Sequence, residues 1–208
     1  MTCSRTPTIQ KASYFSRRKI DTENLRLYHT GFLTIEHPDI HYGRSNADFG
    51  QGFYLSDSEA FSKRWAKQRK GCDAVLNTYD LITEGLNIKR FTRDKEWFGY
   101  IFRNRSIQPD TFAEYDVIIG PIANDTLYDT FGIITSGLLS EKFALELLQI
   151  GAAYTQIVLK TEKAASQLHF LSSEVLNPET LIPYQKAVKD EEKAFQQTFA
   201  ERLSQEEL

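Results

Sequence analysis

The sequence has little cysteine, proline and glycine, and it has no long apolar run. Its 208 residues include 2 Cys, 6 Pro and 11 Gly, which excludes collagen-like and low-complexity chains. Two cysteines, Cys3 and Cys72, cannot form a disulfide framework or supply the four ligands of a structural zinc site. No apolar run approaches the ~20 residues that a membrane helix needs. The first residues also lack the apolar segment of a secretory signal, so we expect a cytoplasmic protein.

The composition is that of a folded domain rather than a disordered chain. It is 41% hydrophobic and 12% aromatic, with 14 Phe and 10 Tyr available to fill a core. The net charge is −3, but residues 1–70 carry 12 Lys and Arg against 7 Asp and Glu. This basic excess leaves open a nucleic-acid-binding protein, although no nucleic-acid-binding motif accompanies it.

Hydrophobic periodicity and turn residues predict an α+β protein with an arm at 1–22, a domain at 23–177 and a helical tail at 178–208. Strands are predicted at residues 25–29, 53–55, 74–82, 86–91, 116–121, 155–160 and 168–172. Helices are predicted from the segment 56–59, at 94–106 and after residue 140, with the first and third ending at Gly71 and Gly151. The tail carries a narrow apolar stripe that could pack on the domain or dock into a partner.

A long irregular segment, residues 30–52, separates the first two predicted strands. Loops of more than about 15 residues are uncommon inside compact domains and are often functional, so this one is the first place to look for a site. The sequence Ser56-Asp57-Ser58-Glu59 then has the form of a capping box, in which Glu59 reaches back to the helix cap. On the following helix, Ala60, Phe61 and Trp65 share one face. Trp65 and Trp97 are expected in the core, and a glycine-bearing loop is expected at 122–137.

Common catalytic and cofactor-binding motifs are missing. There is no Gly-x-x-x-x-Gly-Lys-Ser/Thr phosphate loop and no Gly-x-Ser-x-Gly nucleophile elbow. The pair Gly50-x-Gly52 lacks the third glycine of a dinucleotide-binding turn. His37 and His41 are four residues apart, but Pro38 lies between them and no third ligand is near, so no metal is expected.

Three residues at strand ends remain. His29 ends a strand in Leu-Tyr-His-Thr-Gly, Tyr54 lies in Gly-Gln-Gly-Phe-Tyr-Leu-Ser, and Gln156 opens Thr-Gln-Ile-Val-Leu-Lys. Their order resembles the His-Tyr-Glu branch of the ADP-ribosyltransferase superfamily, and within it a group of small bacterial proteins with Tyr-His-Gly and Asp-Phe-Gly-x-Gly-Phe-Tyr motifs. The resemblance covers residues 25–171.

The resemblance implies a split antiparallel β-sheet core with flanking helices, which binds NAD as a co-substrate between residues 25–31 and 48–55. In the family, the Tyr-His-Gly strand holds the nicotinamide and its ribose, a Tyr-containing strand stacks on the ring, and a later strand begins with the catalytic acid. The catalytic candidates are then His29, Tyr54 and Gln156. The cofactor-binding candidates are His29, Thr30, Gly31, Arg44, Asp48, Gly50, Gly52, Phe53 and Tyr54.

The chemistry of NAD cleavage suits these residue types. Breaking the nicotinamide–ribose bond passes through an oxocarbenium-like state, as glycoside hydrolysis does. His29 could hydrogen-bond a ribose hydroxyl, Tyr54 could stack on the pyridinium, and the fork of Arg44 could hold the pyrophosphate. The backbone after His29 could hold the carboxamide, and the glycines of the loop would let the backbone approach the cofactor closely.

Two departures from the family pattern leave alternatives open. Thr30 separates His29 from Gly31, and Gln156 stands where many members carry Glu. An amide can position a ribose hydroxyl, but it cannot ionise or act as a base. Glu162 could serve as the acid if its strand ends early and folds back. Without an acid, the chain could be a catalytically silent binding module with the same fold.

The resemblance also implies a macromolecular acceptor, either protein or nucleic acid. Small transferases of this superfamily are often toxins held by an antitoxin or used in phage defence, which would suit the C-terminal tail as a docking element. We expect His29, Tyr54 and Gln156 to converge in one pocket, with the first two side chains on the same side of the sheet. Tyr54→Ala should weaken NAD binding with little change in melting temperature. Gln156→Glu should raise or preserve NAD hydrolysis.

Overall fold

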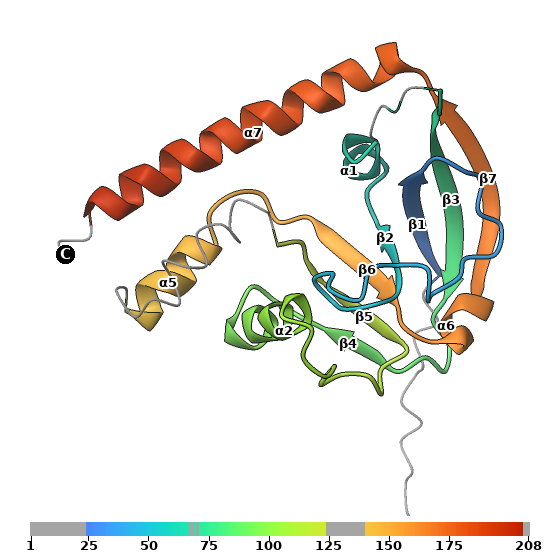
Figure 1. Ribbon diagram of the computed structural model, residues 1–208, viewed down its shortest axis with the longest axis horizontal. Coiled ribbons are helices and arrows are strands. Elements are labelled where there is room, and N and C mark those ends of the chain that lie inside the picture. Colours follow the sequence, from blue (N-terminus) through green and yellow to red (C-terminus); the bar gives the residue numbers. More distant parts are fainter. Residues whose placement is uncertain (1–23, 67–68, 70, 124–139, 206–208) are drawn as a thin grey trace, which may run out of the picture.

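The computed structural model has an α+β fold built on a seven-stranded sheet (Figure 1). It describes residues 24–66, 69, 71–123 and 140–205, so the predicted arm and nearly all of the predicted loop at 122–137 lie outside the described residues. The strands are β1 (Asn24–Gly31), β2 (Phe53–Ser56), β3 (Ala74–Ile82), β4 (Ile88–Arg90), β5 (Val117–Pro121), β6 (Thr155–Leu159) and β7 (Leu168–Leu176). The helices described here are α1 (Glu59–Arg64), α2 (Lys95–Arg105), α5 (Glu141–Leu148), α6 (Glu162–Ser166) and α7 (Pro178–Gln205).

The strand order in the sheet is β4-β5-β6-β2-β1-β3-β7. Neighbouring strands are antiparallel except β4 and β5, which run parallel. The expectation of an antiparallel core is therefore wrong at this edge. The chain between β4 and β5 contains α2, and a crossover of this length lets the second strand run in the same direction as the first.

The sheet is weakest where β1 meets β2. These strands share a single residue pair, Tyr28 with Ser56, whereas β1 pairs with β3 along its whole length and β2 pairs with β6 along its own. Beyond that pair the two halves of the sheet diverge, as Figure 1 shows. The predicted split of the core is confirmed, and it lies where the long segment between the first two strands begins and ends.

Three helices begin at polar residues, and the cap of the first is Ser58 rather than Ser56, where the predicted capping box places it. Ser58, Asp94 and Ser140 each accept a hydrogen bond from the backbone N–H three residues further on. The reciprocal half of the predicted capping box does not form, and Glu59 pairs instead with Lys63, Nζ to Oε1 at 2.7 Å. Because Ser58 is the cap, Glu59 occupies the first helical position, and a capping box needs its acid at the third.

The helix after β2 is shorter than predicted. It ends at Arg64 instead of continuing to Gly71, and Trp65 follows it with 52% of its surface exposed. Phe61 is buried, but Ala60 is exposed, so only part of the predicted apolar face packs on the body. Trp97, by contrast, is 1% exposed, as expected for a core residue.

Two clusters of buried apolar side chains pack against the sheet. One gathers around Leu27, Tyr79 and Leu159, and the other packs α2 against β5 and β6 through Trp97, Tyr100, Ile118 and Val158 among others. Phe49 belongs to the second cluster and is completely buried, although it lies in the irregular segment 32–52. Burial of this side chain fixes the end of the segment against the sheet.

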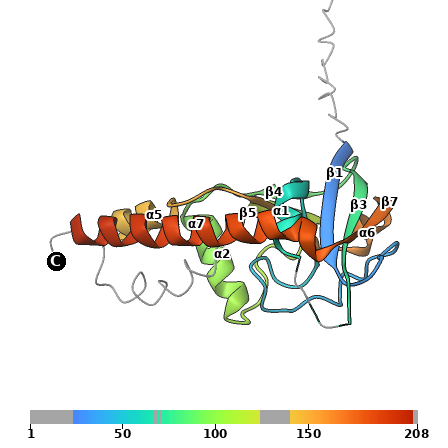
Figure 2. The ribbon, with the colours of Figure 1, turned by 90° about the horizontal axis from the view of Figure 1, so that it is seen from above.

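The C-terminal helix α7 is long and runs past α1 toward α5 (Figures 1 and 2). Phe195 and Phe199 pack with Leu147 of α5, so the predicted apolar stripe is partly used within the chain. Glu191 forms an ion pair with Arg64, with Oε2 and Nη2 2.6 Å apart. None of the helices in the described part of the chain is both long and apolar enough to cross a lipid bilayer.

Candidate functional site

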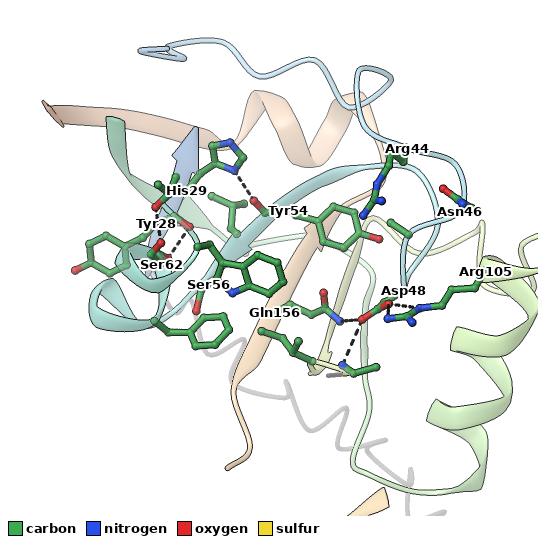
Figure 3. Close-up of a pocket in the computed structure, with 17 residues that line it drawn as sticks. Tyr28, His29, Arg44, Asn46, Asp48, Tyr54, Ser56, Ser62, Arg105 and Gln156 are labelled. Atoms are coloured by element: carbon green, nitrogen blue, oxygen red, sulfur yellow. Dashed lines mark hydrogen bonds and ion pairs between the residues drawn. The ribbon is translucent and has the colours of Figure 1, made fainter. Parts of the chain in front are cut away.

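A pocket of about 480 Å³ lies where β1 and β2 diverge (Figure 3). Its walls come from β1, the irregular segment, β2, α1, the end of α2, and the start of β6. The lining residues are Tyr28, His29, Thr30, Arg44, Asn46, Ala47, Asp48, Tyr54, Leu55, Ser56, Phe61, Ser62, Trp65, Arg105, Ile122, Ala123 and Gln156. The pocket thus combines aromatic faces, two arginines, one carboxylate and two side-chain amides.

The structure brings together six of the ten residues predicted for the site. His29, Tyr54 and Gln156 converge on this pocket as expected, and Thr30, Arg44 and Asp48 line it as well. The other four do not line it, and these are Gly31, Gly50, Gly52 and Phe53. The expectation that these four contact the cofactor is therefore not met by the pocket.

The loop glycines have a packing role instead. A Cβ at Gly52 would lie 2.6 Å from the Leu159 carbonyl oxygen, so only glycine lets the loop cross β6 at this point. Gly50 has a φ of +72°, a left-handed conformation that suits glycine, and its carbonyl faces Tyr54. These glycines let the chain pass close to its own backbone. The spacing of the glycines in the sequence could not show whether the chain itself or a ligand approaches them.

His29 fills the gap between the diverging strands. Its Nδ1 lies 2.8 Å from the backbone oxygen of Tyr54. Because a carbonyl only accepts, Nδ1 carries the proton and donates, which leaves Nε2 as an acceptor in the neutral ring. The ring packs on Phe53, with centroids 4.6 Å apart. His29 thus replaces a missing strand-to-strand hydrogen bond at the edge of the pocket.

The prediction that His29 and Tyr54 point to the same side of the sheet is wrong. Tyr28 pairs with Ser56, so these two side chains and that of Tyr54 share one face, and His29 lies on the other face with Phe53. Side chains alternate along a strand, and the single-residue register decides which ones meet. Both residues still border the pocket because it opens in the gap between the strands.

The protonation of His29 should be visible in the stability of the protein. Burial lowers the pKa of His29 below its ordinary value of 6.5. Between the lowered pKa and 6.5 the unfolded chain binds more protons than the folded one, so the free energy of unfolding falls as pH drops below about 6.5. His29→Gln should flatten this part of the profile, measured by urea unfolding at about pH 5.5 and 7.5.

A glutamine at position 29 can still donate to the Tyr54 carbonyl, so the variant separates titration from the hydrogen bond. His169→Gln, at an exposed position on β7, is the matched control. A His29→Gln profile parallel to that of the wild type over this pH range would contradict the prediction.

Tyr54 presents its ring to the pocket, but its hydroxyl is already used. The hydroxyl donates to the Gly50 carbonyl at 2.7 Å and accepts from the Phe49 N–H at 3.0 Å. Burial raises the pKa of Tyr54 well above its ordinary value of 10, so the hydroxyl stays protonated. In Figure 3 the ring lies between His29 and Arg44. Tyr54 can therefore offer a flat aromatic face, while its hydroxyl holds the loop onto β2.

This arrangement changes the expected effect of replacing Tyr54. Tyr54→Phe leaves the Gly50 carbonyl and the Phe49 N–H without a partner, so we expect a loss of roughly 1–3 kcal/mol in the free energy of unfolding. Tyr54→Ala should lose more, which corrects the expectation of an almost unchanged melting temperature. Urea unfolding measures both, with Tyr42→Phe, at a position 92% exposed, as the control. A Tyr54→Phe protein as stable as the wild type would refute this assignment of the hydroxyl.

A hydrogen-bonded cluster connects the loop, α2 and β6 at the floor of the pocket. Asp48 Oδ1 accepts from Arg105, 2.7 Å from Nε and 2.5 Å from Nη2. Asp48 Oδ2 accepts from the Ala123 N–H and from Gln156 Nε2, each at 3.3 Å. The side chains of Arg105 and Asp48 are only 13% and 12% exposed, so this ion pair is largely shielded from water.

The orientation of the Gln156 amide follows from its partners. Its Nε2 donates to Asp48 and to the Pro121 carbonyl, both at 3.3 Å, and these two groups can only accept. The amide oxygen therefore points away from them, toward the pocket on the side of Tyr54, as Figure 3 shows. Gln156 is 7% exposed and offers one hydrogen-bond acceptor to a ligand.

The loop that carries Asp48 is bound by side chains of α2 and of the residue that follows β6. Lys160 Nζ donates to the Phe49 carbonyl at 2.6 Å and pairs with Asp110 at 3.0 Å, and Asn104 Nδ2 donates to the Asp48 carbonyl at 3.1 Å. Burial lowers the pKa of Lys160, against the opposing effect of Asp110. These contacts place Asp48 before any ligand binds, which is the kind of support that a preorganised site needs.

Sequence reasoning missed several lining residues, Arg105 and Trp65 above all. Arg105 is separated from Asp48 by 57 residues, and its position at the end of a helix carries no signal of that contact. Phe61 and Trp65 do share a face at helical spacing, but in the structure that face also lines the pocket, with Phe61 buried and Trp65 half exposed. Periodicity finds such a face without showing what covers it.

Glu162 does not supply the acid that Gln156 lacks. The strand does end early, at Leu159, but Glu162 then begins α6 with its side chain 74% exposed. Its Oε1 lies 3.6 Å from Nε2 of His41, outside the pocket. Among the described residues, no group of three or more His, Cys, Asp or Glu side chains is arranged to hold a metal ion.

Comparison with known proteins gives a family and one solved structure. A model of a family described as "Protein of unknown function (DUF3990)" matches residues 25–170. No curated protein sequence matches significantly. The fold is similar to a chain of the M. tuberculosis MbcT–MbcA toxin–antitoxin complex, with a TM-score of 0.44 and 14% identity over 79% of this chain and 91% of that chain. Values this low carry no function across, so the function has to come from the pocket.

Proposed function

The chain belongs to the DUF3990 family, and we propose that this member cleaves NAD and transfers ADP-ribose to a macromolecular acceptor. The observation that carries the proposal is the Gln156 amide oxygen, which is buried, oriented and directed into a pocket with aromatic walls. A volume of about 480 Å³ is in the range of small-molecule sites.

Each part of the nicotinamide riboside half of NAD has a suitable neighbour in the pocket. The pyridinium would stack on Tyr54 and Trp65, because a cationic ring is attracted to aromatic faces. Gln156 Oε1 is an acceptor for a ribose hydroxyl, and His29 borders the pocket at the end of β1. Arg44 lies exposed at the edge of the pocket, where it can meet the pyrophosphate.

The reaction needs no resident cofactor. The bond between ribose C1′ and the nicotinamide nitrogen breaks, and its electron pair leaves with the now neutral nicotinamide. A nucleophilic oxygen or nitrogen of the acceptor bonds to C1′ and gives up its proton to water. Positive charge develops on the ribose in between, and preorganised acceptors directed at the sugar stabilise it.

Labelled NAD tests the proposal directly. The protein is incubated with NAD labelled in the adenylate part, alone and with whole-cell lysate, and released nicotinamide and labelled macromolecule are both measured. Loss of the label to protease or to nuclease identifies the acceptor as protein or nucleic acid. A folded protein that releases no nicotinamide and transfers no label would contradict the proposal of an enzyme. It would favour the catalytically silent binding module, which the lack of an acid at position 156 also suits.

A role as a toxin, restrained by an antitoxin or acting in phage defence, is part of the same proposal. It rests on the resemblance of the His29, Tyr54 and Gln156 motifs to small bacterial transferases. Expression from an inducible promoter tests it, since the wild type should arrest growth and Gln156→Ala should not. Growth arrest by both proteins at equal abundance would separate toxicity from the proposed chemistry.

The exposed indole at the pocket should matter for binding more than for folding. Trp65 is 52% exposed and lines the pocket, so Trp65→Ala should weaken NAD binding by roughly 1–3 kcal/mol, the scale of a lost stacking contact. The free energy of unfolding should change little because the ring is half in water. Isothermal titration calorimetry with NAD measures the first and urea unfolding the second. Trp65→Phe is the matched control, and unchanged NAD affinity in Trp65→Ala would contradict the placement.

A further inference from the structure

The pocket contains a carboxylate that β6 does not provide. Among the described residues that line it, Asp48 is the single acidic side chain, and it comes from the loop before β2. Its Oδ2 lies 3.3 Å from Gln156 Nε2. The acid missing at position 156 is thus present one hydrogen bond away from Gln156.

The contact has two physical consequences for Gln156. The first is orientation, because a flipped amide would turn its oxygen toward Asp48 Oδ2 and the Pro121 carbonyl, and acceptors would then face acceptors. The second is polarisation. A carboxylate that accepts from one end of an amide increases the electron density at the amide oxygen, so that oxygen becomes a stronger hydrogen-bond acceptor.

The opposite oxygen of Asp48 keeps the carboxylate in place. Oδ1 is bound by the guanidinium of Arg105 through two nitrogens, so the carboxylate has a fixed plane and a fixed distance from Gln156. The Ala123 N–H also donates to Oδ2 and leaves room there for the Gln156 amide. Asp48 is in this way bound on both sides before any ligand arrives.

We infer that Asp48 is a positioning residue that supplies, through Gln156, the negative charge with which this site stabilises the ribose cation during NAD cleavage. The inference rests on the proposed function and assigns the acid of that reaction to the loop before β2. The Asp48 and Gln156 side chains act as one unit, a carboxylate and an amide joined by a hydrogen bond. Asp48 needs no contact with the sugar for this role.

An exchange of the two groups tests the inference. Asp48→Asn removes the charge while keeping the shape, and it should lower kcat for nicotinamide release by about 10- to 100-fold, with KM for NAD nearly unchanged. Asp48→Asn combined with Gln156→Glu restores one carboxylate and one amide in reversed positions. The double variant should recover most of the lost rate, because interacting neighbours are not additive. Melting temperatures are measured for every variant.

The single variant Gln156→Glu gives a second readout that does not depend on Asp48→Asn folding. It places two carboxylates at hydrogen-bond distance, so they must share a proton at neutral pH. Arg105 faces this pair behind Asp48, and Arg44 faces it from the edge of the pocket. The pH–rate profile of nicotinamide release should show an ionisation above the usual carboxyl range, and the double variant should lack it.

The outcomes separate this inference from the proposed function. Three outcomes, each with an active wild type, would overturn the role of Asp48 alone. The first is an Asp48→Asn protein that releases nicotinamide at the wild-type rate. The second is a rate loss that the double variant does not recover, and the third is a Gln156→Glu profile without the added ionisation. The second of these would show that Asp48 only holds the loop. A wild type that releases no nicotinamide would overturn the proposed function and this inference with it.

Discussion

Gln156→Ala should abolish ADP-ribose transfer while leaving NAD binding almost intact. The amide oxygen of Gln156 points into the pocket, and removing one such preorganised group costs roughly 10²- to 10³-fold in kcat. The rest of the pocket comes from β1, the loop, β2 and α1, so the NAD dissociation constant should change by no more than a few-fold. Single-turnover nicotinamide release measures the rate, and calorimetry measures binding.

The control for this variant is Gln197→Ala, at an exposed position on α7. It should transfer label at the wild-type rate. Gln156→Ala leaves Asp48 with its Arg105 and Ala123 partners, so we expect only about 1 kcal/mol of lost stability. Equal loss of binding and of rate would show that Gln156 contributes to binding rather than to the reaction.

The structure also changes the expectation for Gln156→Glu. From the sequence alone, a carboxylate at this position was expected to raise or preserve NAD hydrolysis. In the folded protein the new carboxylate would face Asp48 Oδ2, 3.3 Å from the present amide nitrogen. Because two carboxylates at that distance share a proton, the single variant should lose activity near neutral pH, and the combination with Asp48→Asn should regain it.

Arg105→Met should cause a large loss of stability. The substitution removes the ion pair of Asp48 and leaves a carboxylate that is only 12% exposed without its cation. Breaking a buried pair by removing one partner costs about 3–5 kcal/mol. Methionine keeps most of the apolar volume of the arginine stem, so the loss reports mainly on the charge. Urea unfolding at neutral pH measures it.

Two further variants make this prediction specific. Arg103→Met removes an exposed arginine from the same helix and should change stability by less than about 0.5 kcal/mol. Arg105→Met combined with Asp48→Asn should recover part of the loss, since position 48 then carries no carboxylate left without its cation. If Arg105→Met and Arg103→Met cost the same, the Asp48–Arg105 pair contributes nothing beyond surface electrostatics.

The candidate site shows which contacts local sequence could not predict. The Asp-Phe-Gly-x-Gly-Phe-Tyr stretch was singled out as part of a site, and Asp48 and Tyr54 do line the pocket. What the pattern could not show is that Gly50 and Gly52 pack against the chain itself and that the Tyr54 hydroxyl binds its own loop. Arg105 had no local signal at all, since its partner lies 57 residues away.

The sequence by itself determined most of the elements and most of their ends, but α6 was not predicted and β7 extends beyond its predicted end at residue 172. Period-two and period-3.6 patterns and polar caps such as Ser140 act over a few residues, so strands such as β3 and helices such as α2 could be predicted closely. Tertiary structure alone decided which faces meet. The single pair between Tyr28 and Ser56 separates His29 from Tyr54 and opens the pocket, and the Arg105 ion pair places Asp48 against Gln156. Such contacts depend on the strand register and on how distant segments of the chain are brought together. Packing and charge pairing act through space, whereas helix and strand propensities act between neighbours along the chain.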